Sequence, residues 1–208
     1  VAQFQCKQEN ISHIMKILID AGADVNCKSK SNWNPLITLC RYYEGAEGLL
    51  PSVKLLIEKG SEVDICNNNG YSALHTVCQN YHKEDLIDLI RLLIQHGANP
   101  HCRTVNGDNP LNLVAQYQCK QGNISHIIKI LIDAGADVNC KNKENWNPLI
   151  TVCRYYEGAE GLLPSVKLLI EKGSEVDICN NNGFSALHAV CQNYQKEDLI
   201  DLIRLLIQ

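Results

Sequence analysis

The sequence lacks a hydrophobic run long enough to cross a lipid bilayer, and it lacks a surplus of positive charge. Its apolar runs are short, as in HIMKILI, and none approaches the roughly 20 residues that a membrane-spanning helix needs. Lysine and arginine number 19 against 23 aspartates and glutamates, which gives a net charge of −4. Such a chain has no cationic excess with which to neutralise a phosphate backbone. We therefore expect no membrane insertion and no nucleic-acid partner.

Motifs of common catalytic and cofactor-binding sites are also missing. The sequence has no Gly-x-Ser-x-Gly, no His-Glu-x-x-His, no phosphate loop and no dinucleotide-binding fingerprint. Two His-x-x-Cys pairs, one at His75 and one at His188, each offer two soft ligands, whereas a closed zinc site needs four. We expect no catalytic residue, no cofactor and no metal, so the chain is not expected to be an enzyme.

The first ten residues, VAQFQCKQEN, have neither the apolar core nor the cleavage site of a secretory signal peptide. The chain begins with Val rather than Met. We expect it to be a piece of a longer protein.

The chain is instead rich in repetition. Residues 1–95 match residues 114–208 with nine differences. A shorter period is marked by glycines that follow apolar runs at spacings of 38, 37, 38 and 38 residues: Gly22, Gly60, Gly97, Gly135 and Gly173. The long repeat is therefore three shorter units. With 45% apolar residues, the chain has the composition of a folded protein and not of a disordered one.

One unit, from Gly107 to Cys140, shows the expected secondary structure. Pro110 suits the first turn of a helix, where its missing N–H costs nothing, and it opens the short helical segment LNLVAQYQ. A second helix follows in ISHIIKILIDA, with apolar residues at i, i+3, i+4 and i+7 counted from Ile124. Gly135 then stands where a left-handed residue ends a helix. A helix–turn–helix–loop unit cannot bury its faces alone, so the units must stack.

Five segments resemble the T-P-L-H-x-A-A motif of ankyrin repeats: NPLITLC (34–40), SALHTVC (72–78), NPLNLVA (109–115), NPLITVC (147–153) and SALHAVC (185–191). The resemblance covers essentially the whole chain. It implies an all-α fold, an ankyrin-type α-solenoid of stacked helix–turn–helix–loop repeats, in which the motif histidine is structural. The units are longer than the usual repeat of about 33 residues. The extra residues fall between the two helices, and we expect an extra helical turn or a longer loop there.

The resemblance divides the chain into one array over residues 1–208. Its expected parts are a partial repeat 1–27, four repeats at 28–66, 67–102, 103–140 and 141–179, and a partial repeat 180–208.

Eleven cysteines raise the possibility of a ladder of disulfides between repeats. Stacked helices lie ~8–10 Å apart, whereas a disulfide needs Cα atoms within ~7 Å. We therefore expect reduced cysteines that act as small apolar packing residues, in a cytoplasmic or nuclear protein. Asn10 and Asn123 begin two glycosylation sequons, but the same asparagines suit the cap of a second helix, which we favour over glycosylation.

The resemblance also implies a contact surface, because loop tips and the exposed sides of first helices form the concave face of ankyrin-like stacks. Large aromatic residues hold the same tip position in four units, and aromatic residues with arginine are the usual composition of interaction hot spots. The expected partner-binding residues are Lys30, Trp33, Arg41, Tyr42, Asn68, Tyr71, Asn80, Asp108, Tyr117, Lys143, Trp146, Arg154, Tyr155 and Phe184.

These features predict a monomeric scaffold that binds another protein or peptide on its concave face. Two alternatives stay open. The aromatic rings could only pack on neighbouring loops, in which case the array is a structural spacer within a larger multi-repeat protein. The close match of the two halves also fits an engineered or recently duplicated array without a dedicated partner.

Overall fold

The computed structural model describes residues 11–43, 49–118, 122–156, 161–193 and 199–207. The chain divides into two units, Val1–Cys102 and Arg103–Gln208, and each is described by itself. Unit 1 contains these helices among its described residues: α2 (Ile11–Asp20), α3 (Pro35–Tyr42), α4 (Leu50–Glu58), α5 (Ala73–Asn80) and α6 (Leu86–Gln95). Unit 2 contains, in its described part, α7 (Pro110–Tyr117), α8 (Ile124–Asp133), α9 (Pro148–Tyr155), α10 (Leu162–Glu171), α11 (Ala186–Asn193) and α12 (Leu199–Leu206).

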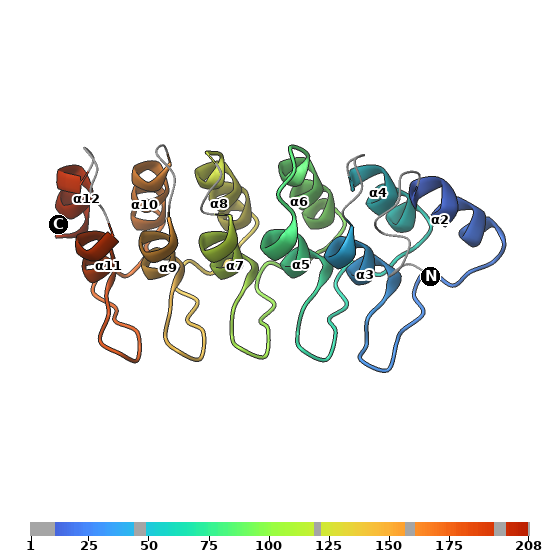
Figure 1. Ribbon diagram of the computed structural model, residues 1–208, viewed down its shortest axis with the longest axis horizontal. Coiled ribbons are helices and arrows are strands. Elements are labelled where there is room, and N and C mark those ends of the chain that lie inside the picture. Colours follow the sequence, from blue (N-terminus) through green and yellow to red (C-terminus); the bar gives the residue numbers. More distant parts are fainter. Residues whose placement is uncertain (1–10, 44–48, 119–121, 157–160, 194–198, 208) are drawn as a thin grey trace. The chain divides into compact units, whose positions relative to one another are not determined.

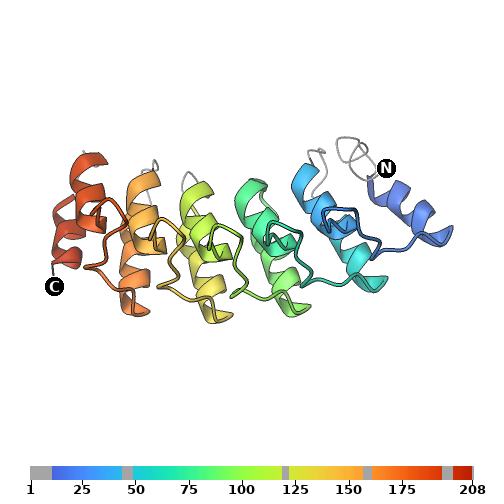
Figure 2. The same ribbon diagram turned by 90° about the horizontal axis from the view of Figure 1, so that it is seen from below.

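The helices of each unit form two layers (Figures 1 and 2). In unit 2, the first helices α7, α9 and α11 pack in one row, and the second helices α8, α10 and α12 pack in the other. Unit 1 has the same arrangement, with α3 beside α5 and α4 between α2 and α6. Each first helix also packs on the second helix of its own repeat. This is the predicted all-α architecture of stacked helix–turn–helix–loop repeats.

The first helices begin where the sequence predicts, because the residue before each one caps it. The Asn147 side chain accepts a hydrogen bond of 2.8 Å from the backbone N–H of Ile150, and Pro148 occupies the first turn. Asn34 and Asn109 do the same for α3 and α7. These caps satisfy backbone donors that have no partner within the helix.

The second helices end at glycines, as the spacing predicts. Gly135 follows α8 with φ 102°, and its N–H donates to the carbonyl of Ile132 over 2.8 Å. The next N–H, of Ala136, reaches back to the carbonyl of Leu131 over 2.9 Å. This pair of bonds needs a left-handed residue, which glycine supplies without steric cost.

The extra length of the repeats is a loop where the structure describes it. In repeat 67–102, the loop from Tyr81 to Asp85 joins α5 to α6. The Tyr81 hydroxyl accepts a 2.9 Å hydrogen bond from the N–H of Leu49 and donates one of 2.5 Å to Asp85. Asp85 also accepts from the N–H of Leu50 over 3.3 Å. The long loop thus caps the start of α4 in the preceding repeat. The corresponding segments of the other repeats lie largely outside the described residues.

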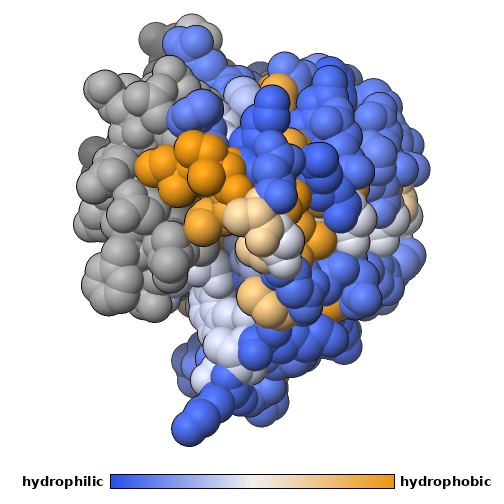
Figure 3. All heavy atoms as spheres, turned by 90° about the vertical axis from the view of Figure 1, so that its right-hand side faces the viewer, coloured by the Kyte–Doolittle hydropathy of each residue, from blue (hydrophilic) through white to orange (hydrophobic). Residues whose placement is uncertain are grey.

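Whether a side chain is buried depends more on which helices pack against its own helix than on the local sequence. Leu131 on α8 is fully buried, and α7 packs on α8. Leu18, its counterpart on α2, is 38% exposed and lines an apolar groove of about 550 Å³ together with Ile14 and Met15. Figure 3 shows apolar surface on this end of unit 1. The counterpart of this surface on α8 is covered by α7.

The nine cysteines among the described residues form no disulfide with one another. Cys40, Cys78 and Cys153 are buried in first helices, as expected, but Cys191 is exposed. The thiols of Cys66 and Cys102, at equivalent places in adjacent repeats, lie close enough to interact.

The expected cap at Asn123 is only partly correct. Asn123 occupies the position before α8, but its side chain makes no capping hydrogen bond. Its backbone carbonyl accepts from the N–H groups of His126 and Ile127 instead. Asn10 lies outside the described residues.

Candidate interaction surface

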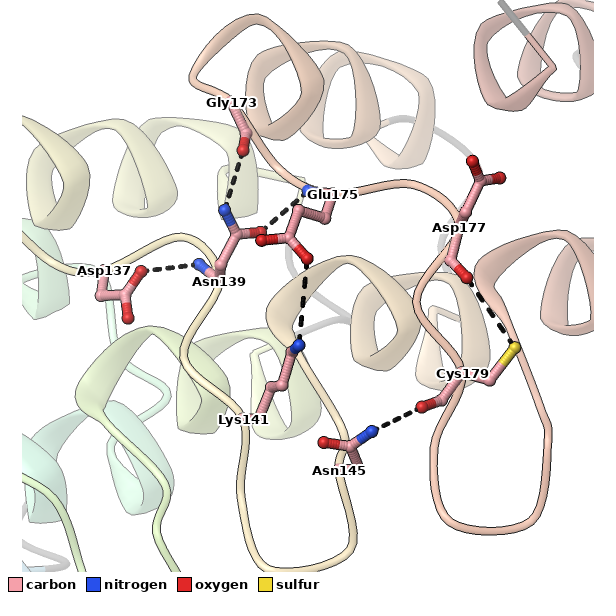
Figure 4. A network of polar contacts seen from close by, with 8 residues as sticks. All are labelled: Asp137, Asn139, Lys141, Asn145, Gly173, Glu175, Asp177 and Cys179. Carbon is pink, nitrogen blue, oxygen red and sulfur yellow. Dashed lines mark hydrogen bonds and ion pairs between the residues drawn. The ribbon is translucent and has the colours of Figure 1, made fainter.

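Asparagine side chains connect the loops of adjacent repeats (Figure 4). The Asn139 amide donates to the carbonyl of Gly173 over 2.8 Å, and its oxygen accepts from the N–H of Glu175 over 2.8 Å. Asn26 makes the same two bonds in unit 1, with Gly60 and Glu62. These bonds fix the spacing of adjacent loops, on which the surface at their tips depends.

A second asparagine connection lies nearer the tips. Asn145 has a left-handed backbone, φ 65°, and its amide donates to the carbonyl of Cys179 over 2.7 Å (Figure 4). Asn32 repeats the geometry with φ 63° and donates to the carbonyl of Cys66 over 2.6 Å. Asparagine tolerates the left-handed region better than most other residues with a side chain. The same residue therefore forms the turn at one loop tip and connects that loop to the loop of the next repeat.

Asn68, one of the expected partner-binding residues, is part of this loop structure. Its backbone N–H donates to the carbonyl of Ser31, and its exposed amide donates to the carbonyl of Lys30 over 3.4 Å. Asn181 occupies the same place in unit 2 and donates to the carbonyls of Glu144 and Lys143. Sequence reasoning assigned Asn68 to partner contact alone, because hydrogen bonds between loops have no signal in the local pattern.

The aromatic residues of unit 2 form a continuous row. The ring centroid of Trp146 lies 6.0 Å from that of Tyr155 and 6.2 Å from that of Phe184. Phe184 lies in turn 5.7 Å from His188. The guanidinium carbon of Arg154 lies over the Phe184 ring, 5.7 Å from its centroid. Five residues of adjacent repeats thus form one amphipathic strip, in which Trp146 and Phe184 are half-buried.

Unit 1 repeats part of this strip. Trp33 lies 6.0 Å from Tyr42, and Tyr71 lies 5.9 Å from His75. The Arg41 guanidinium bonds to the side chain of Asn80 in the next repeat. A hollow of about 220 Å³ is lined by side chains that include Trp33, Arg41 and Tyr71. Here too the expected residues come together.

A smaller and more acidic hollow of unit 2 lies between Asp108 and the following repeat. It has a volume of about 60 Å³, and its walls are formed by Asp108, Asn112, Gln116, Asn142, Glu144, Trp146, Thr151 and Tyr155. Asp108 is 8% exposed, and its carboxylate accepts a 3.0 Å hydrogen bond from the amide of Asn142. Burial raises the pKa of this carboxyl and outweighs the amide hydrogen bonds and the nearby Arg103, which lower it.

Asn112 was missed by sequence reasoning, although it stands where two of the other motifs have histidine, His75 and His188. The Ser72 N–H donates to Nδ1 of His75, so Nε2 carries the proton and donates to the carbonyl of Cys102 over 3.0 Å. Asn112 donates to the matching carbonyl, that of Cys140, over 3.2 Å. The sequence signal that could have identified Asn112 was a polar residue at a motif position that is expected to be buried. The structure thus gives the motif histidine a structural role at His75.

The remaining expected residues lie apart from the two hollows. Lys30 and Lys143 are exposed at loop tips, and Tyr117 is exposed at the end of α7. Among the described residues, no group of three or more His, Cys, Asp or Glu side chains is placed to hold a metal ion. Within the same residues, every helix is too short or too polar to cross a membrane.

Comparison with known families gives one match. The family model for ankyrin repeats matches in three copies, at residues 3–84, 44–123 and 116–208. No curated protein matches the chain in sequence. Ankyrin repeats generally mediate protein–protein interactions, and the family is typically non-enzymatic.

Proposed function

This chain belongs to the ankyrin repeat family, and we propose that it is a scaffold that binds a partner protein or peptide through its loop tips and first helices. One observation carries the proposal. In unit 2, Trp146 lies beside Tyr155, and Arg154 lies over the ring of the next tip residue, Phe184. In unit 1, Trp33 lies beside Tyr42 and lines one hollow together with Arg41.

The physical argument rests on the half-buried state of these rings. Trp33, Tyr71, Trp146 and Phe184 keep part of their surface open to solvent. A large ring that is fixed by its neighbours loses little conformational entropy when a partner covers it, and it contributes a large apolar area to the interface. A spacer has no need of large aromatic residues at equivalent tip positions.

A pull-down from cell extract, analysed by mass spectrometry, tests the proposal. The baits are the parent chain and a variant with Trp33→Ala, Tyr71→Ala, Trp146→Ala and Phe184→Ala. We expect at least one protein that the parent retains and the variant loses. The matched control carries Ile17→Ala and Ile200→Ala, which remove exposed apolar side chains of second helices, and it should retain that protein.

Circular dichroism establishes that every bait is folded. If the parent and the tip variant retain the same proteins, the scaffold proposal fails, and the spacer or the duplicated array without a partner takes its place. We further propose a monomer, with no nucleic-acid partner, in a reducing compartment such as the cytoplasm or nucleus. The compartment is supported by the burial of Cys40, Cys78 and Cys153 in first helices, where they act as small apolar packing residues.

A further inference from the structure

In the acidic hollow of unit 2, the side-chain donors of Asn112, Asn142 and Thr151 are already used in hydrogen bonds, while acceptor atoms remain. The Asn142 amide donates to Asp108, and its oxygen accepts from the N–H groups of Glu144 and Trp146. The Thr151 hydroxyl donates to the carbonyl of Asn147 over 2.7 Å. These contacts leave lone pairs of Thr151 and the carboxylates of Asp108 and Glu144 facing one hollow.

Asn112 supplies an independent observation. Its side chain is 2% exposed and forms part of the wall of the hollow. Its amide nitrogen donates to the carbonyls of Cys140 and Trp146, over 3.2 and 3.3 Å. Its Oδ1 atom accepts no hydrogen bond within the described residues. A buried acceptor without a donor is destabilising, so a donor that enters the hollow from outside is favoured.

The aromatic side chains of the hollow indicate what kind of donor group it accepts. Trp146 and Tyr155 line the same hollow, with ring centroids 6.0 Å apart. The faces of such rings attract cations within about 6 Å. Carboxylates, an unpartnered amide oxygen and aromatic faces together complement a group that carries positive charge and only donors. In proteins these groups are the ammonium of lysine and the guanidinium of arginine.

We infer that the hollow formed by Asp108, Asn112, Glu144 and Trp146 is a subsite for a lysine or arginine side chain of the partner. The inference deepens the proposed scaffold function, on which its biological role rests, by naming the partner's chemistry at one position. A guanidinium is expected to bind more tightly than an ammonium, because it is planar, stacks on an aromatic ring and offers more donors.

The two halves of the chain provide an internal comparison. Ser31 stands beside Trp33 where Glu144 stands beside Trp146. The hollow lined by Trp33, Arg41 and Tyr71 lies between Trp33 and the following repeat, and no carboxylate lines it. The cation subsite is therefore expected in unit 2 and not at Trp33, although the surrounding sequences are nearly identical.

The two tryptophans of the chain permit a direct test by NMR. The probe is N-acetyl-arginine amide, titrated into the ¹⁵N-labelled chain while both indole N–H signals are followed, with assignment from a Trp33→Phe variant. We expect a saturable shift of the Trp146 signal and none of the Trp33 signal. The neutral analogue N-acetyl-citrulline amide should bind at least tenfold more weakly, and N-acetyl-lysine amide should fall between the two.

Single substitutions distinguish binding of arginine in this hollow from a general attraction to the negative charge of the protein. Asp108→Asn keeps the shape and one acceptor oxygen, and Glu144→Ser installs the residue of the other half. Each should weaken arginine binding, Asp108→Asn by about tenfold and Glu144→Ser by a smaller factor. Glu171→Gln removes the same charge from α10, where Glu171 pairs with Lys167, and should leave binding unchanged.

Three results overturn the inference: no shift of the Trp146 signal, equal shifts with arginine and citrulline, or equal binding by the parent and Glu144→Ser chains. A hollow that holds only water gives the first of these. The two proposals can fail independently. If the pull-down captures a partner but the NMR titration shows no cation binding, only the subsite inference is wrong. If the titration shows cation binding but the pull-down captures no partner, the subsite inference stands and the scaffold proposal is wrong.

Discussion

The rings of Trp146 and Phe184 hold the same position in adjacent repeats, and their centroids lie 6.2 Å apart with planes inclined at 45°. Such a tilted pair is worth about 0.5–1.5 kcal/mol beyond the area that it buries. We expect a double-mutant cycle of Trp146→Ala and Phe184→Ala, measured by urea unfolding, to give a coupling free energy in this range. A cycle of Trp146→Ala with Ile200→Ala should give none, because Ile200 is 61% exposed on a second helix. Equal coupling in both cycles would show that the ring contact contributes nothing specific.

The left-handed backbone of Asn145 predicts that glycine at this position destabilises the protein less than alanine does. Both Asn145→Ala and Asn145→Gly lose the bond to Cys179. Alanine keeps a Cβ atom in the left-handed region without the amide that lets asparagine tolerate it, whereas glycine has no Cβ atom there. We expect the alanine variant to be less stable than the glycine variant by about 1 kcal/mol in urea unfolding. Asn182 is the control, since it is not among the described residues with positive φ, and there glycine should be no better than alanine. Alanine at least as stable as glycine at Asn145 contradicts the prediction.

The Tyr81 hydroxyl predicts a large effect for a small change. Tyr81→Phe removes one oxygen and leaves the N–H of Leu49 without its acceptor. We expect a loss of about 1–3 kcal/mol of unfolding free energy, the usual cost of a buried unsatisfied group. Tyr117→Phe, at a side chain that is 40% exposed, should change stability by less than about 0.5 kcal/mol. Similar values for the two variants would show that the Tyr81 network does not stabilise the fold.

The burial of Asp108 predicts a dependence of stability on pH. Burial raises the pKa of this carboxyl above its unfolded value of 3.8. Between the two pKa values the folded state binds more protons than the unfolded state, so this carboxyl reduces stability as pH rises through that window. Asp108→Asn removes the effect. We expect the variant to be more stable than the parent at neutral pH, with the difference shrinking as pH falls towards 3.8.

Thermal unfolding of both chains from neutral pH to about pH 4 measures this difference. Glu171→Gln, which removes an exposed carboxylate, should show no comparable gain at neutral pH. A parent chain that is the more stable at neutral pH would show that the hydrogen bonds of the Asp108 carboxylate outweigh its burial.

The cysteines predict a graded reactivity. Cys27, Cys179 and Cys191 are exposed and should react with iodoacetamide in the folded protein. Burial raises the pKa of the Cys153 thiol to about 12 and that of Cys78 further. The thiolate is the reactive form, so these two should react only in denaturant. Peptide mapping by mass spectrometry distinguishes the sites, and early labelling of Cys78 would contradict its burial.

Much of the fold is determined by local sequence. The cap at Asn147, the proline after it and the glycine that ends each second helix act within one turn, so their effect is visible in a short window. The period of these signals predicted the stacked repeats. The aromatic tip positions followed from the same period, and the structure places Trp146 and Phe184 in contact.

Only the tertiary structure decided which side chains are buried and what they contact. SALHTVC and SALHAVC differ at one position, yet Cys78 is buried and Cys191 is exposed. Leu131 is likewise buried, whereas its counterpart Leu18 is exposed. The burial of Asp108 and the unpartnered oxygen of Asn112 are likewise invisible in the pattern. The physical reason is that burial and hydrogen bonding between repeats depend on which neighbours pack against a helix, while the repeated sequence specifies only the helix itself.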